Sequence, residues 1–237
     1  MSEEHPTAEL LVIANRLPVR RVEHGWETSP GGLVAALAPV LAKRRGAWVG
    51  WSGDAADAGS RGTLTVPFEH AEMLLQALPK TAGEVVDNYE GAANGAIWPL
   101  YHDAVQAPEF HRHWWRTHVA INRRFAEAAA RLAAPGAVVW IHDYQLQFVP
   151  RMLRDLRPDV RIGFFLHIPF PPEELFVRLP WRRDLIEGLL GADLVGFQTL
   201  SDVRNFRSLA RRLAGHPVRH GDVTVGDRPV STGAIPI

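Results

Sequence analysis

AVVWIHDY, residues 137–144, and RIGFFLHIPF, residues 161–170, are continuous apolar runs that end in polar residues. Strands that are buried on both faces of a parallel sheet have this pattern. The segment between them, FVPRMLRDLRPD at 148–159, reads as a helix and leaves room for a right-handed crossover. Together these stretches predict two parallel strands joined by a helix.

The same alternation continues on both sides of this unit. A short apolar run at 10–14 is followed by a glycine turn and by apolar residues at helical spacing in 33–45. Helix, strand and helix are expected within 184–215, and a last strand at 231–237. This order predicts a doubly wound α/β sheet, in which ligands bind beyond the carboxyl ends of the strands.

The middle of the chain supplies further elements. The longest is a helix at 108–134, because Trp115, Val119, Asn122 and Ala126 recur on one of its faces. The other predicted elements are strands at 47–53 and 63–68 and short helices at 71–78 and around 83–91.

Composition limits the possible functions. The 237 residues suit a single domain, and 46% hydrophobic with 22% charged residues is ordinary globular usage. Lys+Arg and Asp+Glu both number 26, so the chain has no overall attraction for nucleic acid or an acidic membrane. The acidic, polar start and the shortness of the apolar runs predict a cytoplasmic protein without a membrane anchor.

Cysteine and histidine usage bears on cofactors. The absence of cysteine excludes disulfides, thiolate zinc sites and thiol catalysis. The eleven histidines show no H-E-x-x-H spacing, so neither a metal nor another cofactor is predicted.

Two candidate anion-binding features follow the first strand. Arg16 carries a planar, permanently charged fork that suits a phosphate, although an arginine paired with a surface carboxylate is the alternative. Gly31 and Gly32 precede a helix whose first amides could bind a diphosphate, but they also fit an ordinary tight turn.

Polar residues also follow the two strands quoted first. His142 and Asp143 are neighbours, so their side chains start towards opposite faces. Asp143 could accept hydrogen bonds from sugar hydroxyls or a proton, or it could cap the next helix. His167 could donate to a hydroxyl or be a hydrogen-bonded core histidine. Tyr89, Trp51 and Trp98 could line a sugar site, with core packing as the alternative.

A set of longer motifs makes these readings more specific. They occur in the order ANR, PGGL, AWVGWSG, NYEGAANGAIWPLYH, WWRTHVAINRRFA, VWIHDYQL, RIGFFLHIPFP and ADLVGFQT. In content and order they resemble the N-terminal half of the trehalose-6-phosphate synthase family, over nearly the whole chain. The resemblance implies a two-domain GT-B glycosyltransferase, of which residues 1–237 form the N-terminal, acceptor-binding Rossmann-like domain.

The resemblance also implies roles for the candidate residues. Arg16 would bind the phosphate of glucose 6-phosphate, with Tyr89 and Asp143 on the same acceptor. Trp51 and Trp98 would wall that pocket.

On the donor side of the implied site, Gly31 and Gly32 would border the diphosphate of UDP-glucose or a similar nucleotide-glucose. His167 would touch the transferred glucose, and it forms with Asp143 the expected catalytic pair. In this family the anomeric configuration is retained without an obvious protein nucleophile, the leaving phosphate helping to take the acceptor's proton.

Departures from the family keep alternatives open. Ala14 stands where the family usually has Ser, and Asn88 and Ala92 stand where it has aromatic residues. The chain stops before the family's donor-binding domain, which favours a non-catalytic sugar-phosphate-binding module as a second reading and predicts that the chain alone is inactive. The changed acceptor loop keeps a cyclitol-phosphate transferase on the same scaffold as a third reading. The donor nucleotide and the choice between a monomer and a homo-oligomer stay open.

Overall fold

The sheet is the centre of the molecule. The computed structural model describes residues 7–22, 25–43, 46–53, 62–68 and 71–236. In this part of the chain ten strands form one sheet in the order β10-β11-β12-β9-β8-β7-β1-β4-β6-β5. From β12 to β6 neighbouring strands are parallel, and the strands added at both edges are antiparallel. Their bounds are β1 Ala8–Arg16, β4 Gly46–Trp51, β5 Gly62–Phe68, β6 Ala71–Ala77, β7 Ala133–His142, β8 Arg161–Phe165, β9 Leu194–Phe197, β10 Val218–Arg219, β11 Asp222–Val225 and β12 Arg228–Ala234.

Helices connect the strands, and a separate hairpin follows β1. The hairpin pairs β2 (Val19–Val22) with β3 (Gly25–Thr28). The helices are α1 Gly32–Lys43, α2 Ala82–Glu84, the π-helical segment η1 Val85–Ile97, α3 Trp98–Tyr101, α4 Arg112–Leu132, the single turn η2 Tyr144–Leu146, α5 Val149–Leu156, α6 Glu173–Phe176, α7 Arg182–Leu189 and α8 Leu200–Leu213.

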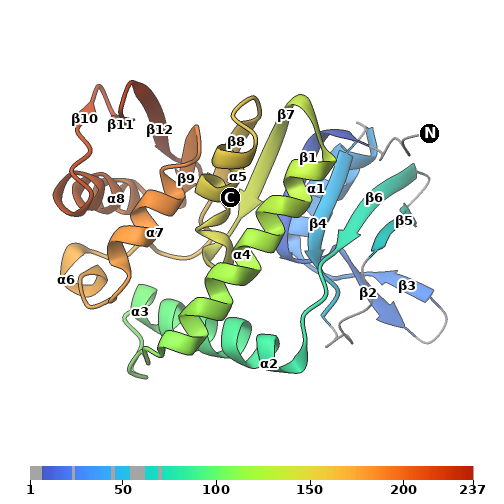
Figure 1. Cartoon of the computed structure of the whole chain (residues 1–237), viewed down its shortest axis with the longest axis horizontal. Helices are drawn as coiled ribbons and strands as arrows, with labels where there is room; N and C mark the ends of the chain where they lie inside the picture. Colours follow the sequence, from blue (N-terminus) through green and yellow to red (C-terminus); the bar gives the residue numbers. More distant parts are fainter. Residues whose placement is uncertain (1–6, 23–24, 44–45, 54–61, 69–70, 237) are drawn as a thin grey trace.

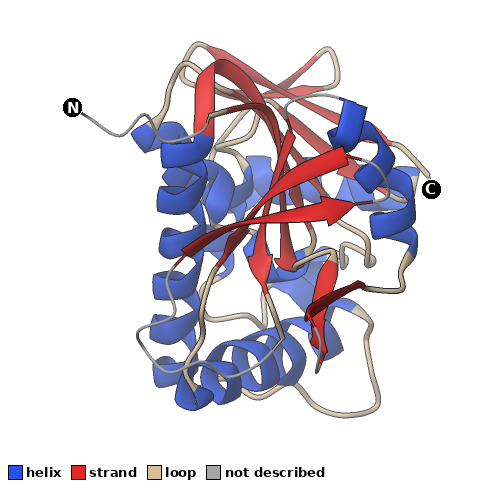
Figure 2. Cartoon of the chain, turned by 90° about the vertical axis from the view of Figure 1, so that its right-hand side faces the viewer, coloured by secondary structure: helices blue, strands red, loops and turns tan. Residues whose placement is uncertain are grey.

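Two apolar cores lie on the two faces of the sheet. Along β1, Leu11 and Ile13 point into the larger core with α4, α5, α7 and α8, whereas Val12 and Ala14 point into the smaller core under α1. Figures 1 and 2 show this layered arrangement, with the sheet between helices. The alternation follows from the two-residue repeat of a strand, and it confirms the predicted doubly wound α/β fold.

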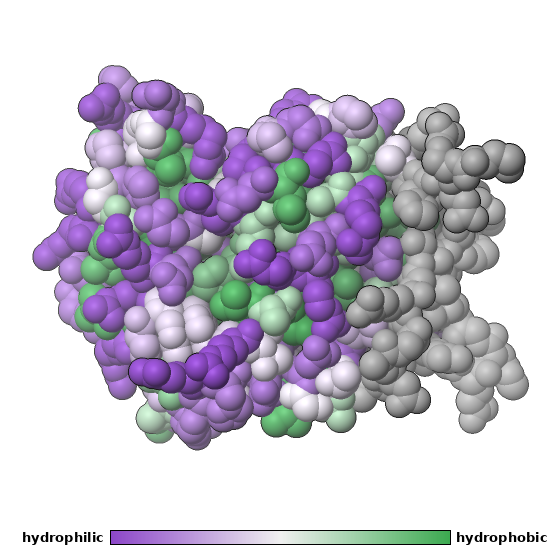
Figure 3. All heavy atoms as spheres, viewed as in Figure 1, coloured by the Kyte–Doolittle hydropathy of each residue, from purple (hydrophilic) through white to green (hydrophobic). Residues whose placement is uncertain are grey.

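The long helix α4 covers the larger core because its sequence is amphipathic. Trp115, Asn122 and Ala126 are buried and Val119 is partly buried, as predicted. The outer surface on this side is largely hydrophilic, with hydrophobic residues between the polar ones (Figure 3). The helix begins four residues later and ends two residues earlier than the predicted 108–134.

Two predicted elements differ from the structure. The segment predicted as a helix at 71–78 is strand β6, which pairs with β4 and β5. Leu74 and Leu75 face opposite sides of the sheet, and each packs against a different core. Because both residues are apolar and adjacent, their sequence pattern resembles the apolar face of a helix. The last strand, predicted at 231–237, is β12, which begins at Arg228 and ends at Ala234; residue 237 lies outside the described residues.

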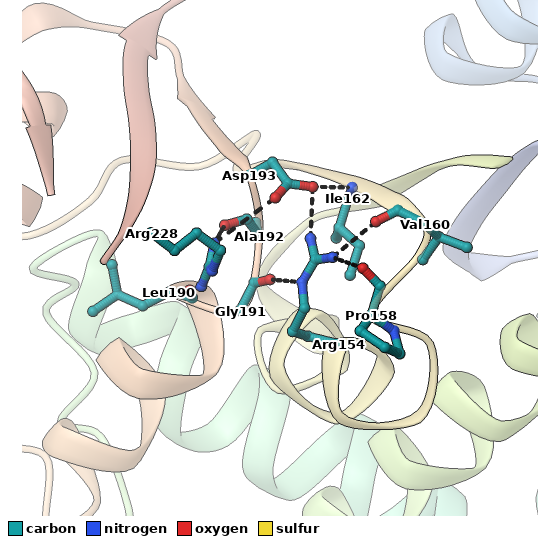
Figure 4. Close-up of polar contacts among 9 residues, drawn as sticks. All are labelled: Arg154, Pro158, Val160, Ile162, Leu190, Gly191, Ala192, Asp193 and Arg228. Carbon is teal, nitrogen blue, oxygen red and sulfur yellow. Dashed lines mark hydrogen bonds and ion pairs between the residues drawn. The ribbon is translucent and has the colours of Figure 1, made fainter. Parts of the chain in front are cut away.

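A polar cluster ties together the amino ends of β8, β9 and β12, opposite the strand ends where ligands are expected (Figure 4). Arg154 donates to Asp193 at 2.6 Å and to the carbonyl of Val160 at 2.9 Å, and Asp193 accepts from the amide of Ile162 at 2.7 Å. Arg228 reaches the same carboxylate at 3.8 Å. These charged side chains pair with one another and with backbone groups of the loops, so they stabilise this end of the sheet.

None of the helices in the described part of the chain is both long and apolar enough to cross a bilayer.

Candidate functional site

A cleft lies at the point where the strand order reverses. The chain runs from β1 outward through β4 and β6, and then returns to place β7 on the other side of β1. A cleft of about 570 Å³ opens there, and its lining includes Asn15, Arg16, Tyr89, Asp143 and His167. Doubly wound folds bind their ligands at such a reversal.

Arg16 ends β1 and is held in place by aromatic rings. Its guanidinium carbon lies 4.2 Å from the ring centre of Trp51 and 5.6 Å from that of Tyr89. Gly53, with a φ of 106°, lies against the guanidinium, and any Cβ there would collide with it. Among the described residues Arg16 has no carboxylate partner, so the alternative of a surface ion pair has no support there. Arg16 is thus a preorganised, exposed cation.

Arg20 is the second arginine on the cleft lining. It donates to the carboxylate of Glu27 at 2.7 and 3.0 Å, across the hairpin of β2 and β3. Its charge is therefore already paired, which leaves Arg16 as the better candidate for an anionic ligand.

Asp143 combines the two roles that the sequence left open. Its Oδ1 accepts hydrogen bonds from the amides of Tyr144 at 3.0 Å and His167 at 3.2 Å, and it caps η2. The residue has a φ of 76°, a left-handed conformation that is unusual outside glycine. Burial raises the pKa of Asp143, while the nearby charge of His167 opposes the shift. The carboxylate is a helix cap that also faces the cleft.

His142 and His167 form a pair behind this carboxylate. Nδ1 of His142 lies 3.1 Å from Nε2 of His167, so one ring donates to the other. Burial lowers the pKa of His142 to about 3, and burial also lowers that of His167 against the opposing effect of Asp143. His142 is neutral at pH 7, and His167, unlike His142, is only partly buried. The partly exposed His167 can exchange a hydrogen bond with a ligand.

The glycines lie at the border of the cleft and not within it. Gly31 and Gly32 stand at the amino end of α1, and a Cβ on either would meet nothing within 4 Å. The protein itself does not require glycine there, so the space is available to a ligand. Gly32 lines a second hollow of about 560 Å³, mostly apolar, which shares His142 and His167 with the cleft.

The two tryptophans are placed differently from the prediction that they wall the pocket. Trp51 is 2% exposed and lies beneath Arg16, because its ring is packed into the sheet end. Trp98 is on α3, is 41% exposed and packs against His102 with ring centres 4.2 Å apart. Neither is among the residues that line the cleft. Trp51 supports the cation, and Trp98 lies outside the cleft in this structure.

Sequence reasoning missed a group of buried polar residues under the cleft. Lys80, Asn88 and His118 are at most 2% exposed and are joined by hydrogen bonds. Asn88 and Ala92, the departures from the family's aromatic residues, both point into the protein and away from the cleft. One signal was available, since Lys43 and Lys80 are the only lysines of a chain that otherwise uses arginine.

Metal binding has no support in the described part of the chain. There, no three His, Asp or Glu side chains come together in a way that could hold a metal ion.

A cleft with a fixed cation, at the switch point of a doubly wound sheet, is the kind of site at which Rossmann-like domains bind anionic ligands. Comparison with known proteins makes this class more specific. The profile of glycosyltransferase family 20 matches residues 8–237, and the chain belongs to this family. The fold is the N-terminal half of a GT-B glycosyltransferase.

The similar proteins are trehalose-6-phosphate synthases. The one from Mycolicibacterium gilvum is 52% identical, over 100% of this chain and 50% of its own length, and the one from Mycolicibacterium smegmatis is 53% identical over 98% and 48%. A crystal structure of the UDP-forming enzyme from Burkholderia xenovorans superposes with a TM-score of 0.85 at 28% identity, covering 98% of this chain and 48% of that one. The chain thus spans about half the length of these relatives.

Two of the solved structures carry ligands. The Burkholderia xenovorans enzyme in complex with glucose-6-phosphate has a TM-score of 0.81 at 28% identity, covering 97% of this chain and 49% of that one. The Escherichia coli enzyme bound with UDP-2-fluoro glucose has a TM-score of 0.81 at 29% identity, covering 94% and 47%.

Proposed function

We propose that this chain is the acceptor-binding half of a retaining glucosyltransferase that makes trehalose 6-phosphate from a nucleotide-glucose and glucose 6-phosphate. The observation that carries the proposal is the exposed Arg16 guanidinium, fixed on Trp51 and Tyr89 at the switch point. A planar fork held in this way suits a phosphate monoester.

The acceptor half of the proposal assigns three contacts. Arg16 binds the phosphate, Tyr89 lies beside it, and Asp143 accepts hydrogen bonds from sugar hydroxyls. Oδ1 of Asp143 already accepts two amide hydrogen bonds, so its orientation is fixed before the ligand arrives. The relative crystallised with glucose-6-phosphate supports this ligand.

The donor half of the proposal concerns the other side of the cleft. Gly31 and Gly32 leave room for a diphosphate at the amino end of α1, and His167 contacts the transferred glucose. The bond between the anomeric carbon and the diphosphate oxygen breaks as the bond to the acceptor oxygen forms. The acceptor's proton passes to the departing diphosphate, so Asp143 orients the acceptor and is not a nucleophile.

A second domain is needed to complete this chemistry. Most of the rate in such a transfer comes from aligning the two substrates and from cations that stabilise the leaving diphosphate. The relatives have about as much chain again as the part matched here. We therefore expect binding of the acceptor by this chain alone, without turnover.

The test has two stages. Calorimetry compares binding of glucose 6-phosphate and of glucose to this chain, and only the phosphate ester should bind measurably. A coupled assay for nucleoside diphosphate release then follows the chain with UDP-glucose and glucose 6-phosphate, before and after addition of the C-terminal half of the Mycolicibacterium gilvum relative. We expect turnover only after the addition.

Each outcome selects a function. Robust turnover by the chain alone contradicts the half-site, and failure to bind glucose 6-phosphate contradicts the acceptor assignment. Binding without turnover after the addition favours the sugar-phosphate-binding module. Preference for a cyclitol phosphate favours the related transferase.

A further inference from the structure

A buried cluster of four polar side chains extends inward from Asn15 on the cleft lining: Asn15, Lys80, Asn88 and His118, all at most 9% exposed. The ammonium of Lys80 donates to Oδ1 of Asn15 at 3.1 Å and to Oδ1 of Asn88 at 2.8 Å. The amide of Asn88 lies 2.9 Å from Nδ1 of His118. Since the oxygen of Asn88 faces Lys80, its nitrogen donates to Nδ1 of His118.

This cluster is joined directly to the proposed phosphate site. Asn15 precedes Arg16 in β1, and Asn88 precedes Tyr89 in η1. The ring of Trp51 is shared, with the guanidinium carbon of Arg16 at 4.2 Å and the ammonium of Lys80 at 4.8 Å from its centre. Two cations thus use one aromatic ring, one of them exposed and the other 1% exposed.

In these surroundings the Lys80 side chain is partly protonated and partly neutral near pH 7. Burial, and then the charges of Arg16 on β1 and Arg124 on α4, lower the pKa of Lys80 to about 7. Glu84 on α2 opposes the shift, but its carboxylate is paired with Arg124 at 2.6 Å. His118 on α4 is neutral, because burial lowers its pKa to about 3.

We propose that Lys80 is a positioning residue of the phosphate site, which takes up a proton from solvent when a phosphate ester binds beside Arg16. This inference rests on the proposed acceptor site. The physical reason is that an anion near a buried amine favours its charged form. The site therefore prefers anionic to neutral sugars, and it loses affinity for the anion as rising pH removes the proton from Lys80.

The proton can be counted by calorimetry. The chain is titrated with glucose 6-phosphate at about pH 7.5 in two buffers of different ionisation enthalpy; the ester is already a dianion there, since its second pKa is about 6. We expect uptake of about half a proton per ligand, because an opposite charge at close range raises a pKa by about one unit or more. Between about pH 7 and pH 8.5 the affinity should fall several-fold.

Two variants identify the titrating group. Lys80→Met cannot take up a proton, and Lys80→Arg keeps a permanent charge. Neither should show proton uptake or a decrease in affinity over this pH range, and Lys80→Arg should keep the higher affinity at about pH 8.5. If Lys80→Met does not fold, the comparison of proton uptake between the wild-type chain and Lys80→Arg still tests the proposal.

The possible failures are distinguishable. If glucose 6-phosphate does not bind, or binds equally well to Arg16→Ala, the proposed acceptor site is wrong. If it binds through Arg16 without proton uptake by the wild-type chain, or if both Lys80 variants keep the uptake, the acceptor site stands and the role of Lys80 is overturned.

Discussion

Arg16 and Lys80 are cations on one tryptophan ring, and they differ in their access to water. The Arg16 side chain is exposed at the mouth of the cleft, whereas Lys80 is 1% exposed beneath it. A guanidinium keeps its charge in either place, while a buried ammonium loses it readily. The layer at the cleft surface therefore carries fixed charge, and the layer below it carries charge that depends on pH and on ligands.

Asp143 at the cleft and His118 in the layer below it differ in the same way. Asp143 lies at the cleft with an oxygen anchored by two amides. His118 lies below, fully buried, with Nε2 lacking a hydrogen-bond partner among the described residues. The carboxylate at the surface has a fixed orientation, and the histidine below it is kept neutral by burial. Four predictions test this division.

The largest effect is expected from removing the fixed charge. Arg16→Ala should weaken binding of glucose 6-phosphate by about 100-fold or more, because a hydrogen bond to a charged group contributes about 1.5–3 kcal/mol and the phosphate would lose its main cation. The affinity of Arg16→Lys for glucose 6-phosphate should lie between those of wild type and Arg16→Ala, since lysine keeps the charge without the planar fork. Arg151→Ala, which breaks an exposed pair with Asp155 on α5, is the control. Equal affinity of Arg16→Ala and wild type, measured by calorimetry, would remove Arg16 from the site.

The next effect is on stability in acid. The folded pKa of His118 is about 3, below its ordinary value of 6.5, so above pH 6.5 the ring is neutral in both states. Below that value only the unfolded chain takes up the proton, and the unfolding free energy falls by about 1.4 kcal/mol per pH unit. Between pH 6.5 and about pH 5 the wild-type chain should thus lose about 2 kcal/mol relative to His118→Gln.

Urea unfolding at several pH values measures this difference. His113→Gln is the matched control, because His113 lies on the same helix with its side chain 64% exposed. A parallel decline of wild type and His118→Gln would mean that His118 is protonated in the folded chain.

Lys80 should act on stability at the alkaline side, with an effect of similar size. Its folded pKa of about 7 lies below the ordinary 10.5, so between these values the unfolded chain binds more protons. Stability then rises with pH, and from pH 7 to about pH 9 wild type should gain about 2 kcal/mol relative to Lys80→Met. Lys80→Arg should show no such gain over Lys80→Met. A flat difference between wild type and Lys80→Met would show that Lys80 stays charged when buried.

The surface layer was largely predictable from the sequence, whereas the buried layer was not. Arg16, Asp143 and His167 each follow an apolar run, and the rule that ligands bind at the carboxyl ends of strands selects them without any knowledge of packing. In the structure all three line one cleft. Their roles in binding and transfer stay predictions.

The buried cluster depends on tertiary packing alone. Lys80 meets Asn15 across 65 residues, and Asn88 meets His118 across 30, so no local spacing indicates the contacts. The strand β6 was missed for a related reason. Leu74 and Leu75 belong to different cores, and which side of the sheet covers each of them is decided by elements far away in the chain. Local sequence patterns predict where strands end, but they do not predict which side chains pack beneath those ends.

The smallest effect is expected at the ring that the two cations share. Trp51→Phe keeps an aromatic face under Arg16 but reduces its size, and a cation over an aromatic ring contributes about 0.5–1 kcal/mol at an exposed site. Affinity for glucose 6-phosphate should therefore fall by about two- to five-fold, far less than for Arg16→Ala. The proton uptake proposed for Lys80 should also decrease, because a smaller ring stabilises the buried ammonium less.

Trp181→Phe is the control for the general cost of replacing a tryptophan, because the Trp181 ring is stacked on Trp115 with centres 4.3 Å apart. Calorimetry on both variants, well below their unfolding temperatures, separates the outcomes. A loss as large as that of Arg16→Ala would mean that Trp51 fixes the position of the guanidinium and does more than stabilise its charge, and an unchanged affinity would mean that Arg16 is held by its other neighbours.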